Sequence, residues 1–173
     1  YGEGEIPQRG KSFAGGGLPY YSVYETRDGK HITLGSIEPW FFANLCRAVD
    51  REDLIPLQND KEKRPEIAAF LVETMKTRTR DEWFVYLNET DQCVGKMLSL
   101  DELEHDPQVQ ARQMIIEVDD PKHGTVKQVG IGPKLSDTPG SVRNLAPDLG
   151  QHTDEILADL GIGSADINRL REK

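Results

Sequence analysis

The residue whose type and position could do chemistry is Glu38, which falls between an expected strand and an expected helix. Residues 31–34 form the expected strand, and Pro39 suits the first turn of a helix because its missing N–H needs no partner there. Glu38 therefore lies at or near the N-cap, where Ser, Thr, Asp or Asn would bond the first turn better. Its carboxylate is expected to point elsewhere, beside apolar Ile37 and Trp40. We interpret Glu38 as a candidate general base, or as the partner that orients one; a surface cap without a task is the alternative.

The other reactive side chains favour structural roles. The histidines, at positions 31, 105, 123 and 152, lack i,i+4 or H-E-x-x-H spacing, so no metal site is predicted. Cys93 has no readable base nearby, and a buried cysteine on a short strand is the favoured interpretation. Cys46 lies on the apolar face of an expected helix and is assigned to the core.

The composition narrows the class of protein. The 173 residues include 21 Lys and Arg against 30 Asp and Glu, for a net charge of -9, which argues against nucleic acid as a partner. No apolar run approaches the ~20 residues of a membrane span, so no membrane association is expected. Two distant cysteines form no disulfide framework and fit a cytoplasmic location. The chain opens on Tyr1 without Met, and we expect a fragment or a processed product.

The elements that must position Glu38 follow from turn and helix signals. Residues 20–26 and 31–35 alternate around Asp28-Gly29, which predicts a β-hairpin. Helices are expected over 39–49 and 64–76, each with one apolar face. Capping boxes begin two more helices, at Thr79–Glu82 and at Ser99–Glu102. The remaining expected elements are a short strand or loop over 92–98, a short helix over 107–112, a second hairpin over 114–118 and 125–131, and terminal helices over 153–160 and 165–171.

This order of hairpins and helices, without βαβ regularity, predicts the α+β class. We expect an interdomain linker over the Gly-rich residues 1–17, a small α+β domain over 18–131, a second linker over the Pro-bearing residues 132–150, and C-terminal helices over 151–173. A phosphate-binding P-loop in the first segment is the disfavoured alternative, because no G-K-[ST] run there follows a strand. The terminal helices are expected to dock on something outside this chain.

Ordered blocks along almost the whole chain resemble the class III CoA-transferase family, and the α-methylacyl-CoA racemase branch in particular. The blocks are Arg9-Gly10, 15–21 (GGGLPYY), 24–29 (YETRDG), 35–41 (GSIEPWF), 76–83 (KTRTRDEW), 90–94 (TDQCV) and 150–157 (GQHTDEIL). The resemblance covers only the C-terminal half of such enzymes. It implies a missing N-terminal large domain with a Rossmann-like core, to which the last helices of this chain would return.

The resemblance also assigns roles. The catalytic Asp, the His that acts with it in racemases, and much of the CoA site would lie in the missing half, so this chain alone is expected to be inactive. Glu38 matches the family Glu that pairs with that His across the domain interface. The implied substrate is an acyl-CoA thioester, with no permanently bound cofactor, and the residues of this chain that bind it are unknown. The full-length protein is expected to form an interlocked homodimer.

Three functions stay open. The first is α-methylacyl-CoA racemase activity, in which the α-proton of a 2-methylacyl-CoA is removed and returned. The second is transfer of CoA between carboxylic acids through acyl-enzyme intermediates. The third is a non-catalytic interaction domain that keeps the fold. Two positions depart from the racemase pattern, Ala14 before the paired glycines and Lys96 where Pro is frequent.

Overall fold

The computed structural model describes residues 4, 6, 8–13 and 15–172; parts of the first predicted linker, Ala14 included, lie outside the described residues. The chain divides into two compact units, Tyr1–Leu98 and Ser99–Lys173. This division falls inside the predicted domain of residues 18–131. The predicted limits at residues 18, 132 and 151 stay predictions.

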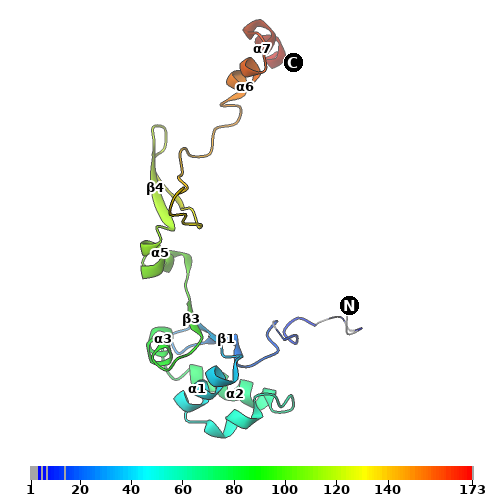
Figure 1. The fold of residues 1–173 in the computed structure, drawn as a ribbon, viewed down its shortest axis with the longest axis vertical. Helices are drawn as coiled ribbons and strands as arrows, with labels where there is room; N and C mark the ends of the chain where they lie inside the picture. Colours follow the sequence, from blue (N-terminus) through cyan, green and yellow to red (C-terminus); the bar gives the residue numbers. More distant parts are fainter. Residues whose placement is uncertain (1–3, 5, 7, 14, 173) are drawn as a thin grey trace. The chain divides into compact units, whose positions relative to one another are not determined.

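The first unit is built on a three-stranded antiparallel sheet in the order β1-β2-β3 (Figure 1). The strands are β1 (Tyr21–Glu25), β2 (His31–Gly35) and β3 (Val94–Met97). The first two form the predicted hairpin around Gly29, whose φ of 72° is the left-handed conformation that the turn requires. The third strand pairs with β2 across some sixty residues of sequence, with Leu34 opposite Val94.

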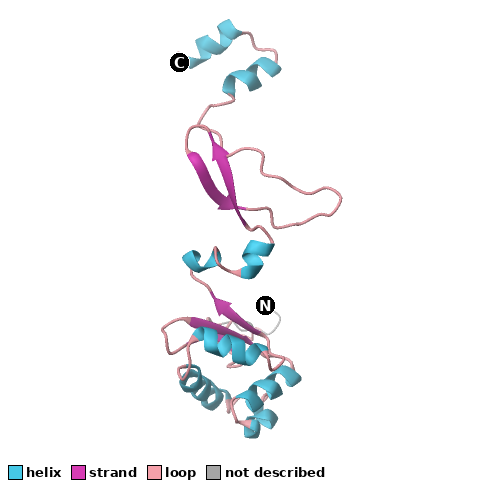
Figure 2. Ribbon diagram, turned by 90° about the vertical axis from the view of Figure 1, so that its left-hand side faces the viewer, coloured by secondary structure: helices cyan, strands magenta, loops and turns pink. Residues whose placement is uncertain are grey.

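Helices gather on one side of this sheet (Figure 2) and close the core. They are α1 (Pro39–Ala48), the 3₁₀ helix η1 (Glu52–Leu57), α2 (Arg64–Met75) and α3 (Arg80–Asn88). Alternate side chains of the hairpin, Tyr24, Ile32 and Leu34, point to the helices and are buried. The helices contribute the other large apolar core residues, Phe42, Leu45, Leu54, Ile67, Leu71, Met75, Trp83 and Leu87.

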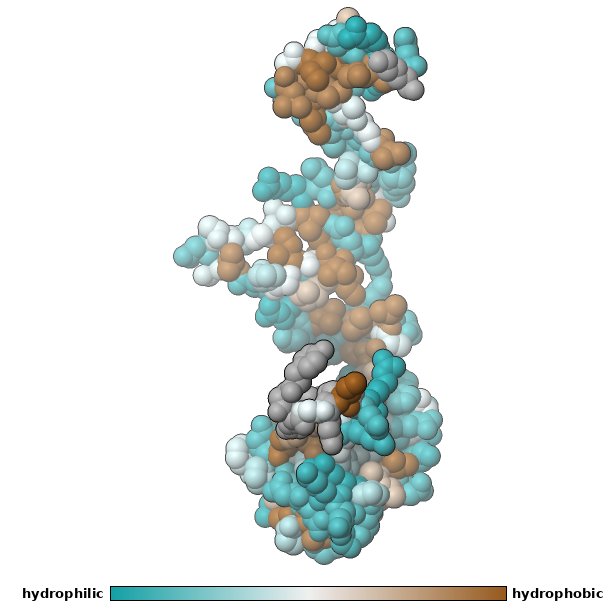
Figure 3. Space-filling view, turned by 90° about the vertical axis from the view of Figure 1, so that its right-hand side faces the viewer, coloured by the Kyte–Doolittle hydropathy of each residue, from teal (hydrophilic) through white to brown (hydrophobic). Residues whose placement is uncertain are grey.

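The second unit has little buried apolar surface. It contains α4 (Leu100–Leu103), α5 (Pro107–Ala111), the hairpin β4 (Ile115–Asp120) and β5 (Gly124–Val129), and the helices α6 (Thr153–Asp159) and α7 (Ser164–Arg171). Between β5 and α6 the chain contains neither helix nor strand. Apolar side chains gather on the surface of α6 and α7 (Figure 3), and Ile156 and Leu160 are more than half exposed.

The structure confirms the α+β class and both predicted capping boxes. Thr79 accepts the backbone N–H of Glu82 while the Glu82 carboxylate accepts the N–H of Thr79, and Ser99 and Glu102 are arranged in the same way. The 3₁₀ helix η1 was not predicted, since its short sequence carries no full apolar period. Within the described part of the chain, no helix combines the length and the apolar character needed to cross a membrane.

The prediction of a buried Cys93 on a strand is wrong. Cys93 is exposed and immediately precedes β3. The pairing of Val94 with Leu34 turns Val94 toward the helices, so the preceding side chain must point to the opposite face. Cys46 is buried as predicted, and burial raises the pKa of its thiol to about 11.

Candidate functional site

Glu38 is the N-cap residue of α1, as the sequence predicts. Its backbone is extended, with φ -65° and ψ 140°, and its carbonyl oxygen accepts the N–H of Phe42 at 3.0 Å. Pro39 occupies the first turn. The Glu38 side chain makes no capping hydrogen bond and is exposed. The carboxylate is therefore held at a helix start without being used by that helix.

The backbone that precedes Glu38 is fixed by hydrogen bonds from three other segments. The N–H of Gly35 donates to the carbonyl of Cys93 at 2.7 Å, and the N–H of Ser36 donates to the carbonyl of Tyr20 at 2.8 Å. The hydroxyl of Ser36, a fully buried residue, donates to Oε1 of Gln92 at 3.1 Å. Because the backbone between β2 and α1 is hydrogen-bonded to these neighbouring segments, the side chains that follow it have a defined direction.

Gln58 supplies the last of these bonds. Its side-chain Nε2 donates to the carbonyl oxygen of Ile37, one residue before Glu38, at 2.7 Å. Its own carbonyl accepts the hydroxyl of Tyr20 at 3.0 Å, and only 7% of the residue is exposed. Sequence reasoning missed Gln58, because one glutamine in a polar stretch gives no sign that it bonds a backbone group 21 positions away.

The surface beside Glu38 is apolar. Trp40, in the first turn of α1, is 58% exposed and lies against the ring of Phe41 with 5.6 Å between the ring centroids. In the described part of the chain, the Glu38 side chain has no ion-pair or hydrogen-bond partner. An ionised carboxylate can accept a hydrogen bond from an imidazole N–H or take up a proton, and the Glu38 carboxylate is free to do either.

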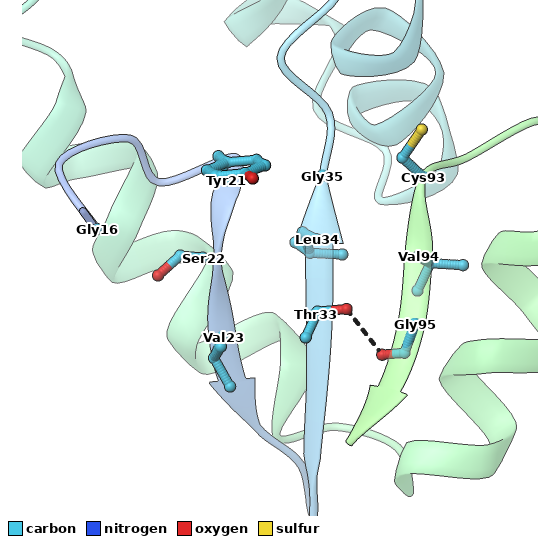
Figure 4. Close-up of a pocket in the computed structure, with 10 residues that line it drawn as sticks. All are labelled: Gly16, Tyr21, Ser22, Val23, Thr33, Leu34, Gly35, Cys93, Val94 and Gly95. Carbon is cyan, nitrogen blue, oxygen red and sulfur yellow. Dashed lines mark hydrogen bonds between the residues drawn. The ribbon is translucent and has the colours of Figure 1, made fainter. Parts of the chain in front are cut away.

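A hollow of about 620 Å³ lies on the sheet face that the helices leave open (Figure 4). It is lined by residues of all three strands, among them Val23, Thr33, Gly35 and Gly95, and by Cys93, which precedes β3. The two glycines have no side chain to fill it: a Cβ on Gly95 would lie 2.8 Å from Oγ1 of Thr33. Glu38 does not line this hollow, although the hollow reaches Gly35 at the same strand end.

None of the histidines is on α1 or in the junction that precedes it. His31 is exposed at the start of β2, and His123 lies in the second hairpin turn with Nδ1 2.9 Å from the Asp120 carboxylate. His152 precedes α6 and lies 3.3 Å from Glu155. Among the residues described by the structure, no three His, Cys, Asp or Glu side chains gather where they could hold a metal ion.

Comparison with known proteins finds relatives of this chain. The model of the CoA-transferase family III matches residues 1–153. The chain is 29% identical to human alpha-methylacyl-CoA racemase over 168 residues, which are 94% of this chain and 42% of that enzyme. It is 31% identical to succinyl-CoA–D-citramalate CoA-transferase of Chloroflexus aurantiacus over 159 residues, which are 88% of this chain and 40% of that enzyme.

A solved structure shares the fold. The crystal structure of a CAIB/BAIF family protein from Brucella suis matches with a TM-score of 0.66 at 21% identity, over 92% of this chain and 42% of that one. The chain therefore spans about two fifths of the length of each of these three relatives. The predicted resemblance is confirmed: this chain belongs to the CoA-transferase family III.

Proposed function

We propose that this chain is the C-terminal portion of an enzyme that acts on CoA thioesters, and that Glu38 is a positioning residue contributed to its active site. The observation that carries this proposal is a carboxylate on a fixed backbone with no use in its own domain. The catalytic Asp and His expected of such an enzyme belong to a large domain outside this chain. By itself, the chain is then inactive.

The first candidate activity is α-methylacyl-CoA racemisation. The thioester carbonyl acidifies the α-carbon, one base removes its proton, and a conjugate acid on the opposite face returns a proton while the enolate is stabilised. Glu38 would accept the N–H of the histidine base. This bond fixes the tautomer and raises the basicity of the ring, as the third group of a triad does. The extent of similarity to alpha-methylacyl-CoA racemase supports this candidate.

The second candidate is transfer of CoA between carboxylic acids, with the Asp of the missing domain as the nucleophile that forms acyl-enzyme intermediates. The similarity to succinyl-CoA–D-citramalate CoA-transferase, at 31% identity, supports it. Under either candidate the substrate is an acyl-CoA and no permanently bound cofactor is required. The homodimer that the family resemblance implies, and the cytoplasmic location that the two distant cysteines fit, belong to the same proposal.

The test is an exchange assay on the full-length enzyme. Incorporation of deuterium at the α-carbon of a 2-methylacyl-CoA reports racemisation, and acyl-CoA formed on an added carboxylate reports transfer. We expect Glu38→Gln to slow the reaction roughly a hundredfold, the size of a lost acid–base contribution. Because a carboxylate stabilises a charged imidazole, its removal should also move the limb of the pH profile that reports the base to lower pH.

Glu73→Gln is the matched control, since Glu73 is an exposed glutamate on α2 of the same unit. It should leave the rate and the pH profile unchanged. An unchanged rate for Glu38→Gln would remove Glu38 from the mechanism. Strong α-proton exchange by the isolated 173-residue chain would show that the essential groups are present here after all.

A further inference from the structure

A second groove in the first unit lies between β1, the glycine-rich loop before it and one side of α2. Its volume is about 860 Å³. On the α2 side, side chains at four-residue spacing share one helix face and form a stripe. They are Arg64, Ala68 and Val72 on α2 and Lys76, the C-cap residue that follows it. At ~1.5 Å per residue this stripe is about 18 Å long, with a cation at each end and apolar side chains between.

The charge of this groove opposes that of the protein. Among the residues that the structure describes, one carboxylate lines the groove, that of Glu25, against four cationic side chains: Lys11, Lys61, Arg64 and Lys76. The whole chain carries a net charge of -9. A positively charged groove in a negatively charged protein attracts anions.

These four cations have no ion-pair partner among the residues that the structure describes, although acidic residues are abundant. Their neighbour Lys63 does have one, at 2.9 Å from the carboxylate of Glu66. Nε of Arg64 is buried and, within the described part of the chain, has no hydrogen-bond acceptor. A buried donor without an acceptor is costly, so Arg64 has an unmet need for a hydrogen-bond acceptor.

Three of the cations lie near the start of α2 or on the loop that faces it. The helix begins at Arg64, and its N-cap residue Lys63 makes no side-chain cap. The first-turn N–H groups add positive potential to that of the side chains. A planar guanidinium binds phosphate oxygens in pairs, and clustered ammonium groups add charge, so this end of the groove matches a phosphate better than a single carboxylate.

We propose that this groove binds a small organic phosphate, with the phosphate against Lys11, Lys61 and Arg64 and the organic part along Ala68 and Val72. The proposal does not depend on the chemistry proposed for Glu38. The phosphate could come from a free phosphorylated metabolite or from the phosphorylated end of a CoA molecule, and the experiment below separates these sources.

The test is a titration of the ¹⁵N-labelled 173-residue chain with four probes, followed by NMR: inorganic phosphate, adenosine 3′,5′-bisphosphate, CoA and a polyglutamate peptide. We expect the amides of Gly16, Gly17, Arg64 and 66–72 to shift, with a Kd of about 1 mM for inorganic phosphate and a Kd roughly tenfold lower for the nucleotide. Similar Kd values for CoA and for the bisphosphate would identify the phosphorylated end of CoA as the ligand of the groove. Preference for other phosphates over CoA would identify a free metabolite.

Arg64→Gln should weaken binding about tenfold or more, because it removes the paired guanidinium bonds. Lys63→Gln is the matched control. It removes one positive charge next to Arg64 in the sequence, but the Lys63 side chain is already paired with Glu66. This substitution should change Kd less than about twofold. Thermal melts of both variants check that they fold. Equal losses of affinity in the two variants would mean that the groove attracts anions only by its general positive charge. Binding of the polyglutamate peptide, with no binding of any phosphate probe, would mean that the groove takes an acidic segment. Either result overturns the proposal.

Discussion

Gln58 is predicted to hold the backbone that presents Glu38, and Gln58→Ala tests this directly. The substitution removes the donor to the Ile37 carbonyl, a bond of 2.7 Å, but leaves the backbone carbonyl of Gln58 that accepts the Tyr20 hydroxyl. A buried acceptor left without a donor costs ~1–3 kcal/mol of stability. This bond is only partly buried, so the expected loss of unfolding free energy is in the lower half of that range, about 1–2 kcal/mol.

The expected loss is large enough to measure. For a domain of about 100 residues, 1 kcal/mol shifts the melting temperature by roughly 4–8 °C, so Gln58→Ala should lower the midpoint of the first unit by about 4 °C or more. Thermal unfolding of the 173-residue chain, followed by near-UV circular dichroism from Trp40 and Trp83, reports this unit because both tryptophans lie in it.

Asn59→Ala is the matched control, since Asn59 follows Gln58 directly and is exposed. It should leave the midpoint within the scatter of the wild type. If Gln58→Ala shifts the midpoint no further than Asn59→Ala does, water replaces the lost donor and the reasoning on the junction is wrong.

Two further predictions concern contacts that join the hairpin and β3 to α3. The hydrogen bond from Thr26 lowers the pKa of Asp28 below its ordinary 3.8, with help from the N–H of Arg80. A lowered folded-state pKa gives stability that is present above pH 3.8 and lost as the pH falls through the folded-state value. Urea titrations should therefore show a smaller stability loss on acidification for Asp28→Asn than for wild type; equal slopes would contradict this. Arg80→Met should destabilise the first unit by about 1–2 kcal/mol, because buried Arg80 donates to the carbonyl of Met97 at 2.9 Å, and an unchanged urea midpoint would show that this bond is dispensable.

Local chemistry explains which parts of the fold could be predicted from the sequence. The Asp28-Gly29 turn, Pro39 at a helix start and the Thr79–Glu82 box each depend on residues within a few positions of one another. Turn geometry and the unpaired N–H groups of a helix start determine the local structure at these positions, and tertiary packing does not change it.

The features that escaped prediction depend on contacts between distant residues. The addition of β3 to the hairpin joins positions some sixty residues apart, and its register decides that Val94 faces the core and Cys93 faces outward. A shift of one residue would exchange the two faces, and no local signal in a four-residue strand fixes that choice. The bond from Gln58 to Ile37 is invisible for the same reason.

The choice of Glu at position 38 is itself informative about the site. A Ser at this N-cap could accept a first-turn N–H, a contribution of about 0.5–2 kcal/mol that Glu38 forgoes because its side chain makes no such bond. We therefore expect Glu38→Ser to stabilise the isolated chain, by about 0.5–1 kcal/mol in urea unfolding. In the full-length enzyme the same substitution should slow the reaction as Glu38→Gln does, so that stability and activity change in opposite directions. A destabilised isolated chain would mean that the Glu38 carboxylate already serves its own domain, and the argument that it is reserved for a partner would fail.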